Sequence, residues 1–332
     1  MENNRPACRR GRVIVAMSGG VDSSVAAAVL KSRRYDVIGI FILMHKNSNP
    51  QDAKMVAKKL KIDFKILDAR KEFRKWVIDY AFKEYKLGNT PNPCVECNRR
   101  IKFKFLLEIM AQLKADYIAT GHYAKIKKGK LFIAKDIKKD QTYFLWTLKQ
   151  KQLKKILFPL GDYTKKQVRG LAEKFKLPIN KKESQDMCFS MPHRSPDSIG
   201  TKSGDILTTD GKIIGQHKGL FLYTIGQRKG IEIGGTGPYY VIRKDFKNNT
   251  LIVSQSQKDL LQKEMVVKNI NWLSGKLYSG KCKIKIRSTA KLADAIIKNN
   301  RIIFNKPQRA ITSGQSAVIY RKGEVLGGGK IL

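Results

Sequence analysis

The chain has 332 residues and a formal net charge of +40, and its longest apolar run covers only the eight residues 37–44. A helix that crosses a bilayer needs about 20 apolar residues, so this pattern argues against a membrane protein. Residues 1–12 are polar and contain no apolar core of a secretory signal, which predicts a cytoplasmic protein. This length predicts two or three domains.

The high positive charge predicts a polyanionic partner, and phosphate backbones are the commonest polyanions. A generally lysine-rich composition is the alternative explanation. Segment 125–155 carries eleven Lys against two Asp, interleaved with Tyr143, Phe144 and Trp146. This pattern indicates an RNA-facing stretch, or else a solvated surface that covers core aromatics.

The first half of the chain alternates predicted strands and helices. Apolar runs predict strands at 13–17, 37–44, 64–67 and 117–120, and helical periodicity predicts helices at 23–32, 51–60, 73–85 and 103–113. We therefore expect an α/β fold with a doubly wound parallel sheet. Ligands bind beyond the carboxyl ends of the strands in such sheets, and Ser18 and Gly121 both follow a predicted strand.

The pattern changes after a linker at 195–200, where short strands and glycine-rich turns replace the helices. We predict a small β-rich central module and then a β-barrel-like C-terminal domain. The expected domains are residues 1–195, 196–262 and 263–332.

Residues 18–24 read Ser-Gly-Gly-Val-Asp-Ser-Ser, between a predicted strand and a predicted helix. Glycines permit a tight turn, and the first turn of a helix offers N–H groups to a phosphate. No Gly-Lys-Ser/Thr follows, so this is not a Walker A loop. It resembles the PP-loop of ATP pyrophosphatases, which split ATP between the α and β phosphates. An ordinary glycine-rich turn is the alternative.

The chain has five cysteines, Cys8, Cys94, Cys97, Cys188 and Cys282. Their odd count and wide spacing argue against a structural disulfide framework in a cytosolic chain. Cys94 and Cys97 form the one Cys-x-x-Cys pair. Such a pair is compatible with thiol chemistry, a metal cluster or a zinc site.

Further blocks stand at 88–98, 101–103, 119–123, 139–145, 183–189, 223–230, 314–318 and 326–329. In this order, with residues 18–24, they resemble the tRNA-specific 2-thiouridylases over nearly the whole chain. The resemblance implies ATP-dependent 2-thiolation of the wobble uridine of tRNA. ATP would adenylate the C2 oxygen, and a cysteine-borne persulfide sulfur would then attack C2. It also implies Mg²⁺, a persulfide sulfur-donor protein and a monomeric enzyme.

The same resemblance implies residue roles. Cys188 would carry the persulfide, and Cys97 would resolve it through a transient disulfide. The ATP-binding residues would be Ala16, Met17, Ser18, Gly19, Gly20, Val21, Asp22, Ser23, Ile42 and Gly121. The tRNA-binding residues would be Asn92, Pro93, His122, Lys139, Asp140, Gln141, Lys285, Ile286 and Gln315.

Cys94 departs from the family pattern, in which many members have an acid/base Asp at this position. A thiol has an unperturbed pKa of about 8.5 against about 3.9 for Asp, so the role of Cys94 is open. Cys94, Cys97 and Cys188 could instead hold a [4Fe-4S] cluster, or a structural zinc together with His193. Arg99 and Arg100 are expected to favour a Cys97 thiolate. The competing functions are another PP-loop ligase and a basic RNA-binding protein without catalysis.

Overall fold

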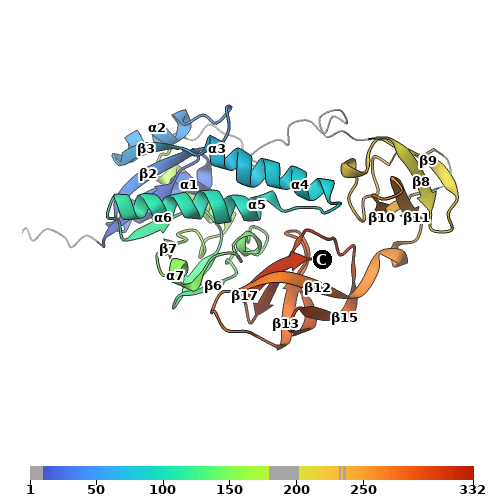
Figure 1. Cartoon of the computed structure of the whole chain (residues 1–332). Coiled ribbons are helices and arrows are strands. Elements are labelled where there is room, and N and C mark those ends of the chain that lie inside the picture. The colour runs from blue at the N-terminus through green and yellow to red at the C-terminus, as the bar shows by residue number, and fades with distance from the viewer. Residues whose placement is uncertain (1–9, 179–201, 232, 235–236) are drawn as a thin grey trace, which may run out of the picture.

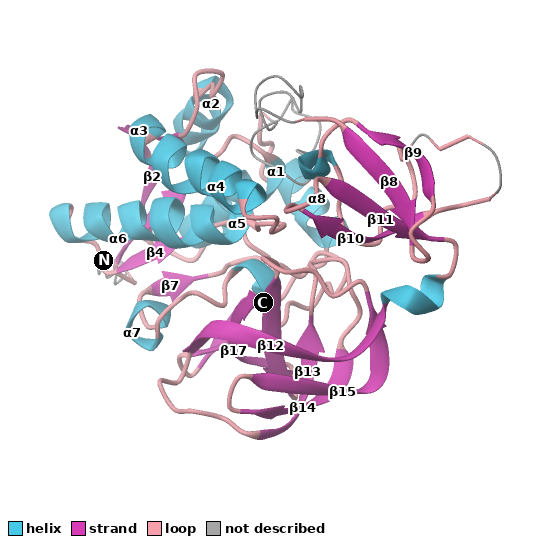
Figure 2. Cartoon of the chain, turned by 45° about the vertical axis from the view of Figure 1, so that its right-hand side comes forward, coloured by secondary structure: helices cyan, strands magenta, loops and turns pink. Residues whose placement is uncertain are grey.

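The computed structural model describes residues 10–178, 202–231, 233–234 and 237–332. Cys8, Cys188 and His193 lie outside this set, so the expectations that involve them are not addressed by the fold. An α/β region, a small β module and a β-barrel follow one another along the chain (Figure 1), and Figure 2 shows the barrel packed beneath the other two. The predicted fold class is confirmed.

The α/β region is built on a parallel sheet with the strand order β3-β2-β1-β4-β7. Side chains of β1 alternate between two cores: Val13 and Val15 pack on one face, and Ile14 on the other. Burial on both faces explains why the strands read as continuous apolar runs. The strands are β1 (Arg12–Ala16), β2 (Asp36–Leu43), β3 (Asp63–Asp68), β4 (Tyr117–Ala119) and β7 (Ile156–Leu157).

Helices cover both faces of this sheet, as a doubly wound fold requires. Helices α1 (Val21–Ser32) and α2 (Gln51–Leu60) pack on one face, and α8 (Lys165–Lys174) packs against α1. Helix α6 (Phe103–Gln112) packs on the other face through Phe103 and Leu106. The short helix α7 (Gln150–Leu153) precedes β7.

The structure contains two π-helical segments that the sequence pattern did not predict, one within the helix expected at 73–85 and one just before the helix expected at 103–113. The helix expected at 73–85 runs as α3 (Arg70–Phe73), a π-helical segment Arg74–Asp79 and α4 (Tyr80–Lys86). Helix α6 is likewise preceded by α5 (Pro93–Glu96) and a π-helical segment Cys97–Lys102. The two π-helical segments pack against each other. Such segments are rare and are frequent at functional sites.

The central module is a four-stranded sheet in the order β10-β11-β8-β9. His217 lies in it with 1% of its surface exposed; its Nδ1 accepts from the N–H of Gly219, and its Nε2 lies 2.9 Å from the carbonyl oxygen of Asn249. The strands are β8 (Gly204–Thr208), β9 (Ile213–His217), β10 (Tyr240–Asp245) and β11 (Thr250–Ser254).

The C-terminal domain is an antiparallel barrel that closes where β12 pairs with β17. A hairpin of the first region, β5 (Lys125–Lys127) and β6 (Lys130–Phe132), extends the same sheet because β6 pairs with β17. The barrel strands are β12 (Leu261–Trp272), β13 (Gly280–Lys285), β14 (Ala293–Lys298), β15 (Arg301–Arg309), β16 (Ser316–Arg321) and β17 (Glu324–Ile331). No helix among the described residues is long and apolar enough to cross a membrane.

Candidate nucleotide and RNA site

The loop between β1 and α1 is held in shape by its own serines. Oγ of Ser23 accepts from the backbone N–H of Ser18 at 3.1 Å and donates to the carbonyl of Gly20 at 3.1 Å. Oγ of Ser24 donates to the same carbonyl at 2.9 Å. The N–H groups in the first turn of α1 have no partner within the helix, so the loop is shaped to receive a phosphate.

Two glycines allow other backbone segments to approach this loop closely. Gly19 has φ +81°, and a Cβ there would lie 2.7 Å from Cβ of Asp52 at the start of α2. A Cβ on Gly121, after β4, would lie 2.8 Å from the backbone nitrogen of Ser23. Gly121 therefore packs directly on the first turn of α1, beside the predicted cradle. Met17 is buried against Gly39, Ala16 ends β1, and Ile42 lies near the end of β2.

The carboxylate of Asp22 has two partners that the sequence did not reveal. Nζ of Lys165, at the start of α8, lies 2.8 and 2.9 Å from its two oxygens. The hydroxyl of Tyr123 donates to Oδ1 at 2.8 Å. Lys165 stands 143 positions from Asp22, so no local motif signals the pair.

The loop before α5, which carries Asn92 and Pro93, is clamped from the barrel. The side-chain amide of Gln315 donates to the carbonyls of Thr90 and Pro91 at 3.0 and 3.3 Å. The N–H of Thr90 donates to the carbonyl of Ser313 at 2.8 Å. The predicted RNA-contacting residues Asn92, Pro93 and Gln315 are thus brought together, with Gln315 supporting the loop.

Cys94 and Cys97 lie one helical turn apart, on α5 and at the start of the π-helical segment that follows. Cys97 is 4% exposed, and its thiol points toward Sδ of Met44 at 3.8 Å, just beyond β2. Cys94 is partly exposed. Ser18 and Gly121 lie beyond the carboxyl edge of the parallel sheet, as their places after predicted strands indicated, and Cys97 lies at the same edge.

The two arginines expected to activate Cys97 have other partners. Nε of Arg100 lies 2.9 Å from Glu96, and its guanidinium stacks over the ring of Trp76 at 4.1 Å. Arg99 lies 3.7 Å from the same carboxylate. Glu96, which no sequence motif singles out, therefore compensates these two charges.

The expected Cys97–Cys188 disulfide involves a residue outside the described set. Cys282 is buried in β13, and burial raises the pKa of its thiol to about 11, which fits an inert core residue. Within the described ranges, no three His, Cys, Asp or Glu side chains gather as a metal site.

The donors beside the cradle suit Mg²⁺ better than a soft metal. Asp22 and the hydroxyls of Ser18 and Ser23 supply hard oxygen atoms. Mg²⁺ is commonly bound by one or two carboxylates together with substrate phosphates. These residues fit such a shared ion.

His122 lies partly buried beside the same edge. Its Nδ1 lies 2.7 Å from Oγ1 of Thr120, and its ring stacks on Phe103 and meets Phe158 edge-on. Burial, together with the charge of Lys102, lowers the pKa of His122 to about 3. The ring is therefore neutral at physiological pH.

The predicted RNA segment 139–141 is tied to both the cradle and the barrel. Gln141 pairs with the backbone of Tyr123 at both its N–H and its Oε1, at 2.9 and 3.0 Å. The carboxylate of Asp140 turns inward, where it accepts from the N–H of Ala134 and the hydroxyl of Thr142. Burial raises the pKa of Asp140, while the charge of Lys285 opposes that rise.

The aromatic residues of segment 125–155 belong to the core and not to an RNA-facing surface. Tyr143 is fully buried, and its hydroxyl donates to the carbonyl of Ser316 at 3.0 Å. Nε1 of Trp146 donates to Oγ of Ser316 at 3.1 Å, and Phe144 meets the Tyr143 ring edge-on. These rings join the α/β region to the barrel, so the alternative explanation of a charged surface over core aromatics is correct for them.

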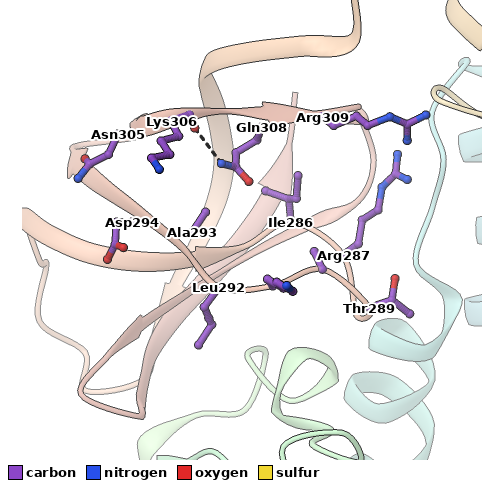
Figure 3. Close-up of a pocket in the computed structure, with 12 residues that line it drawn as sticks. Ile286, Arg287, Thr289, Leu292, Ala293, Asp294, Asn305, Lys306, Gln308 and Arg309 are labelled. Atoms are coloured by element: carbon purple, nitrogen blue, oxygen red, sulfur yellow. Dashed lines mark hydrogen bonds between the residues drawn. The ribbon is translucent and has the colours of Figure 1, made fainter. Parts of the chain in front are cut away.

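A pocket of about 600 Å³ opens on the barrel beside the predicted RNA residues Lys285 and Ile286 (Figure 3). Its lining includes four cationic side chains and a single acidic one, Asp294, which pairs with Lys283 at 2.8 Å. Arg287 and Arg309 lie at one end of this lining in Figure 3, and they donate to the carbonyls of Ile225 and Gly226 in the central module.

Known families match the chain along its whole course. The family described as a tRNA methyl transferase HUP domain matches residues 11–192, a tRNA methyl transferase PRC-barrel domain matches 196–255, and an aminomethyltransferase β-barrel domain matches 262–331.

Curated relatives carry a different activity in their names. A tRNA-specific 2-thiouridylase MnmA of Buchnera aphidicola is 42% identical over 354 residues, covering 96% of each chain. MnmA 2 of Clostridium botulinum is 42% identical and covers 97% of this chain and 98% of its own. MnmA 2 of a Thermoanaerobacter species is 43% identical, covering 96% and 97%. The chain therefore belongs to the tRNA-specific 2-thiouridylase family.

Proposed function

We propose that this protein is a tRNA uridine 2-sulfurtransferase that uses ATP to thiolate C2 of the wobble uridine. One observation carries the proposal: the phosphate cradle at residues 18–23 and the buried thiol of Cys97 lie beyond the same edge of one sheet. A cradle alone serves any PP-loop ligase, and a basic RNA-binding protein needs neither feature. The relatives named above support the choice of tRNA and sulfur.

The residues would divide the reaction between them. The cradle, with Ala16, Met17, Val21, Ile42 and Gly121 around it, would bind ATP, and the oxygen donors at Asp22 would hold Mg²⁺ against its phosphates. A bound Mg²⁺ supplies charge neutralisation for the phosphates. Uridine oxygen O2 attacks the α phosphate, and pyrophosphate leaves. Asn92 and Pro93, on the loop fixed by Gln315, would present the base.

Sulfur transfer would follow on the thiols. A persulfide on Cys188, received from a donor protein, attacks C2, AMP leaves, and the Cys97 thiolate attacks Sγ of Cys188. The products are 2-thiouridine and a Cys97–Cys188 disulfide, which a cellular thiol then reduces. Thiolates are the reactive form, so Cys97 must lose its proton in the tRNA complex.

Three domains, residues 1–195, 196–262 and 263–332, would share RNA recognition. The protein would act as a cytoplasmic monomer. Three of the predicted RNA residues would shape this surface. The carboxylate of Asp140 faces inward, the ring of His122 is neutral, and Gln315 clamps the loop before α5. Lys139, Lys285, Ile286 and the cationic barrel pocket would meet the phosphate backbone.

Mass spectrometry of tRNA nucleosides tests this function directly. Deleting the gene should abolish 2-thiouridine in bulk tRNA, and purified protein with ATP, a persulfide donor and unmodified tRNA should restore it. Normal 2-thiouridine in a deletion strain that has no second copy of the gene would refute the proposal. Release of AMP and pyrophosphate without thiolation would favour another PP-loop ligase.

A further inference from the structure

Lys165 brings a cation to the phosphate cradle from the other end of the α/β region. Its Nζ holds both carboxylate oxygens of Asp22 at 2.8 and 2.9 Å. The Lys165 side chain is 12% exposed, whereas Asp22 is 37% exposed. Asp22 is therefore the more exposed partner of this pair.

The backbone around Lys165 fixes where its amine can reach. Lys165 opens α8, where Thr164 caps the helix by accepting from the N–H of Gln167. The N–H of Lys165 donates to Oδ2 of Asp136 at 2.9 Å. Helix α8 packs on α1, so the first turns of both helices face the same cradle.

The loop of the cradle offers no positive side chain of its own to a bound polyphosphate. Residues 18–24 contain no Lys or Arg, although Asp22 adds a negative charge where a polyphosphate must bind. A Walker A loop solves this problem with a lysine within the loop that reaches the β and γ phosphates. Here Lys165 is a cation that direct contacts hold against the loop.

We propose that Lys165 is a pyrophosphate ligand of this enzyme, held on Asp22 until ATP arrives. This inference rests on the proposed function. Uridine O2 forms a bond to the α phosphorus, its N3 proton passes to solvent, and the bond from that phosphorus to the bridging oxygen breaks. The bridging oxygen keeps the electron pair, and the ammonium of Lys165 stabilises the charge gathered on pyrophosphate.

Equilibrium binding to the full-length protein tests this role without any thiolation step. The probes are magnesium pyrophosphate, α,β-methylene ATP and AMP. Lys165→Met should weaken the binding of pyrophosphate and of the ATP analogue by about ten- to a hundredfold. This is the range for a hydrogen bond to a charged group. AMP, which lacks the β and γ phosphates, should bind as before. Lys165→Arg should retain most of the affinity, and the exposed neighbour Lys166→Met is the matched control.

A double-mutant comparison separates this role from a merely structural one. If Lys165 only neutralises Asp22, then adding Lys165→Met to the Asp22→Asn variant should cause no further loss of pyrophosphate affinity. If Lys165 is instead a direct ligand, Lys165→Met should still lower pyrophosphate affinity by about tenfold in the Asp22→Asn background. Loss of AMP binding together with pyrophosphate binding, or no added loss in the Asn background, would overturn the proposal. If Lys165→Met does not fold, Lys165→Gln gives the same comparison. A wild-type protein that binds pyrophosphate through Lys165 but leaves tRNA unthiolated would refute only the proposed function.

Discussion

Gln315 in the barrel donates its side-chain amide to the carbonyl of Thr90 at 3.0 Å, across 225 positions of the chain. Its Oε1 lies 3.4 Å from the hydroxyl of Tyr143, which itself joins the α/β region to the barrel. The loop predicted to meet the target base is thus shaped by two distant segments. Gln315 therefore connects the barrel directly to the loop that we propose presents the base.

Gly314 makes this clamp possible, and replacing it with Ala should loosen the clamp. Its φ is +91°, and a Cβ there would lie 2.8 Å from Cβ of Asn89 and 2.9 Å from the backbone nitrogen of Thr90. We expect Gly314→Ala to lower the free energy of unfolding by about 2–4 kcal/mol, from backbone strain and overpacking together. Urea denaturation measures the loss.

Gly275→Ala is the matched control for Gly314→Ala. Gly275 also has a positive φ, +74°, but a Cβ there meets no atom within 4 Å. Gly275→Ala should lower the free energy of unfolding by only about 1 kcal/mol, from backbone strain alone. Equal costs for the two substitutions would show that the close approach to Asn89 and Thr90 has no energetic weight.

The sequence predicted the alternating α/β order, the cradle and the barrel because each has a local signal. Strand β1 reads as an apolar run, and the loop after it carries its glycines and serines together. The sequence could not predict Lys165, because its partner Asp22 is distant in the chain. The π-helical turn that begins at Cys97 was also missed, since one added residue per turn hardly changes the apolar pattern of a helix.

Composition alone also could not assign the aromatics of segment 125–155. Lysines beside Tyr143 and Trp146 look alike in sequence whether the rings stack on bases or pack between domains. Only the long-range contacts with Ser316 distinguish the two cases.

Trp146 should therefore matter for stability more than for RNA affinity. Its ring is 8% exposed and lies so close to Gly328 that a Cβ there would meet it at 2.7 Å. Trp146→Ala should reduce the free energy of unfolding by about 3–5 kcal/mol. Measured where the variant is still folded, its tRNA affinity should change less than the ~1–3 kcal/mol expected for a base-stacking ring. A stable variant with strongly weakened tRNA binding would restore the RNA-facing interpretation.

Binding of tRNA should depend steeply on salt, and the barrel pocket should contribute to that slope. Lys291 and Lys306 line the pocket and are exposed. If each contacts a phosphate, each Lys→Gln substitution should reduce the slope of log K against log salt by about 0.7–0.9. Lys258→Gln and Lys263→Gln remove the same charges from exposed positions outside the pocket. Equal effects from both pairs, or a nearly flat salt dependence of the wild type, would assign the +40 charge to general composition.

His122 should make the protein less stable in mild acid. Its folded pKa of about 3 lies below the unfolded value of 6.5, so the unfolded chain binds more protons between these values. The contribution of His122 to stability is complete above pH 6.5 and is lost as the pH falls toward 3. Between pH 7 and 5 the loss should be roughly 1–2 kcal/mol. His122→Gln should flatten the dependence of stability on pH over this interval; an unchanged slope would mean that the ring titrates alike in the folded and unfolded states.

The three cysteines of the proposed site should not be equivalent if the chemistry needs only a thiol pair. Cys97→Ser and Cys188→Ser should each abolish thiolation, because each removes one partner of the transient disulfide. Cys94→Ser should reduce thiolation only partly, since the partly exposed Cys94 is not a partner in that disulfide. All three variants should still release pyrophosphate, which checks that the cradle remains intact. Total loss of thiolation from all three, together with iron in anaerobically purified protein, would instead indicate a cluster held by the three thiolates. Stoichiometric zinc that is retained without effect on activity would indicate a structural site.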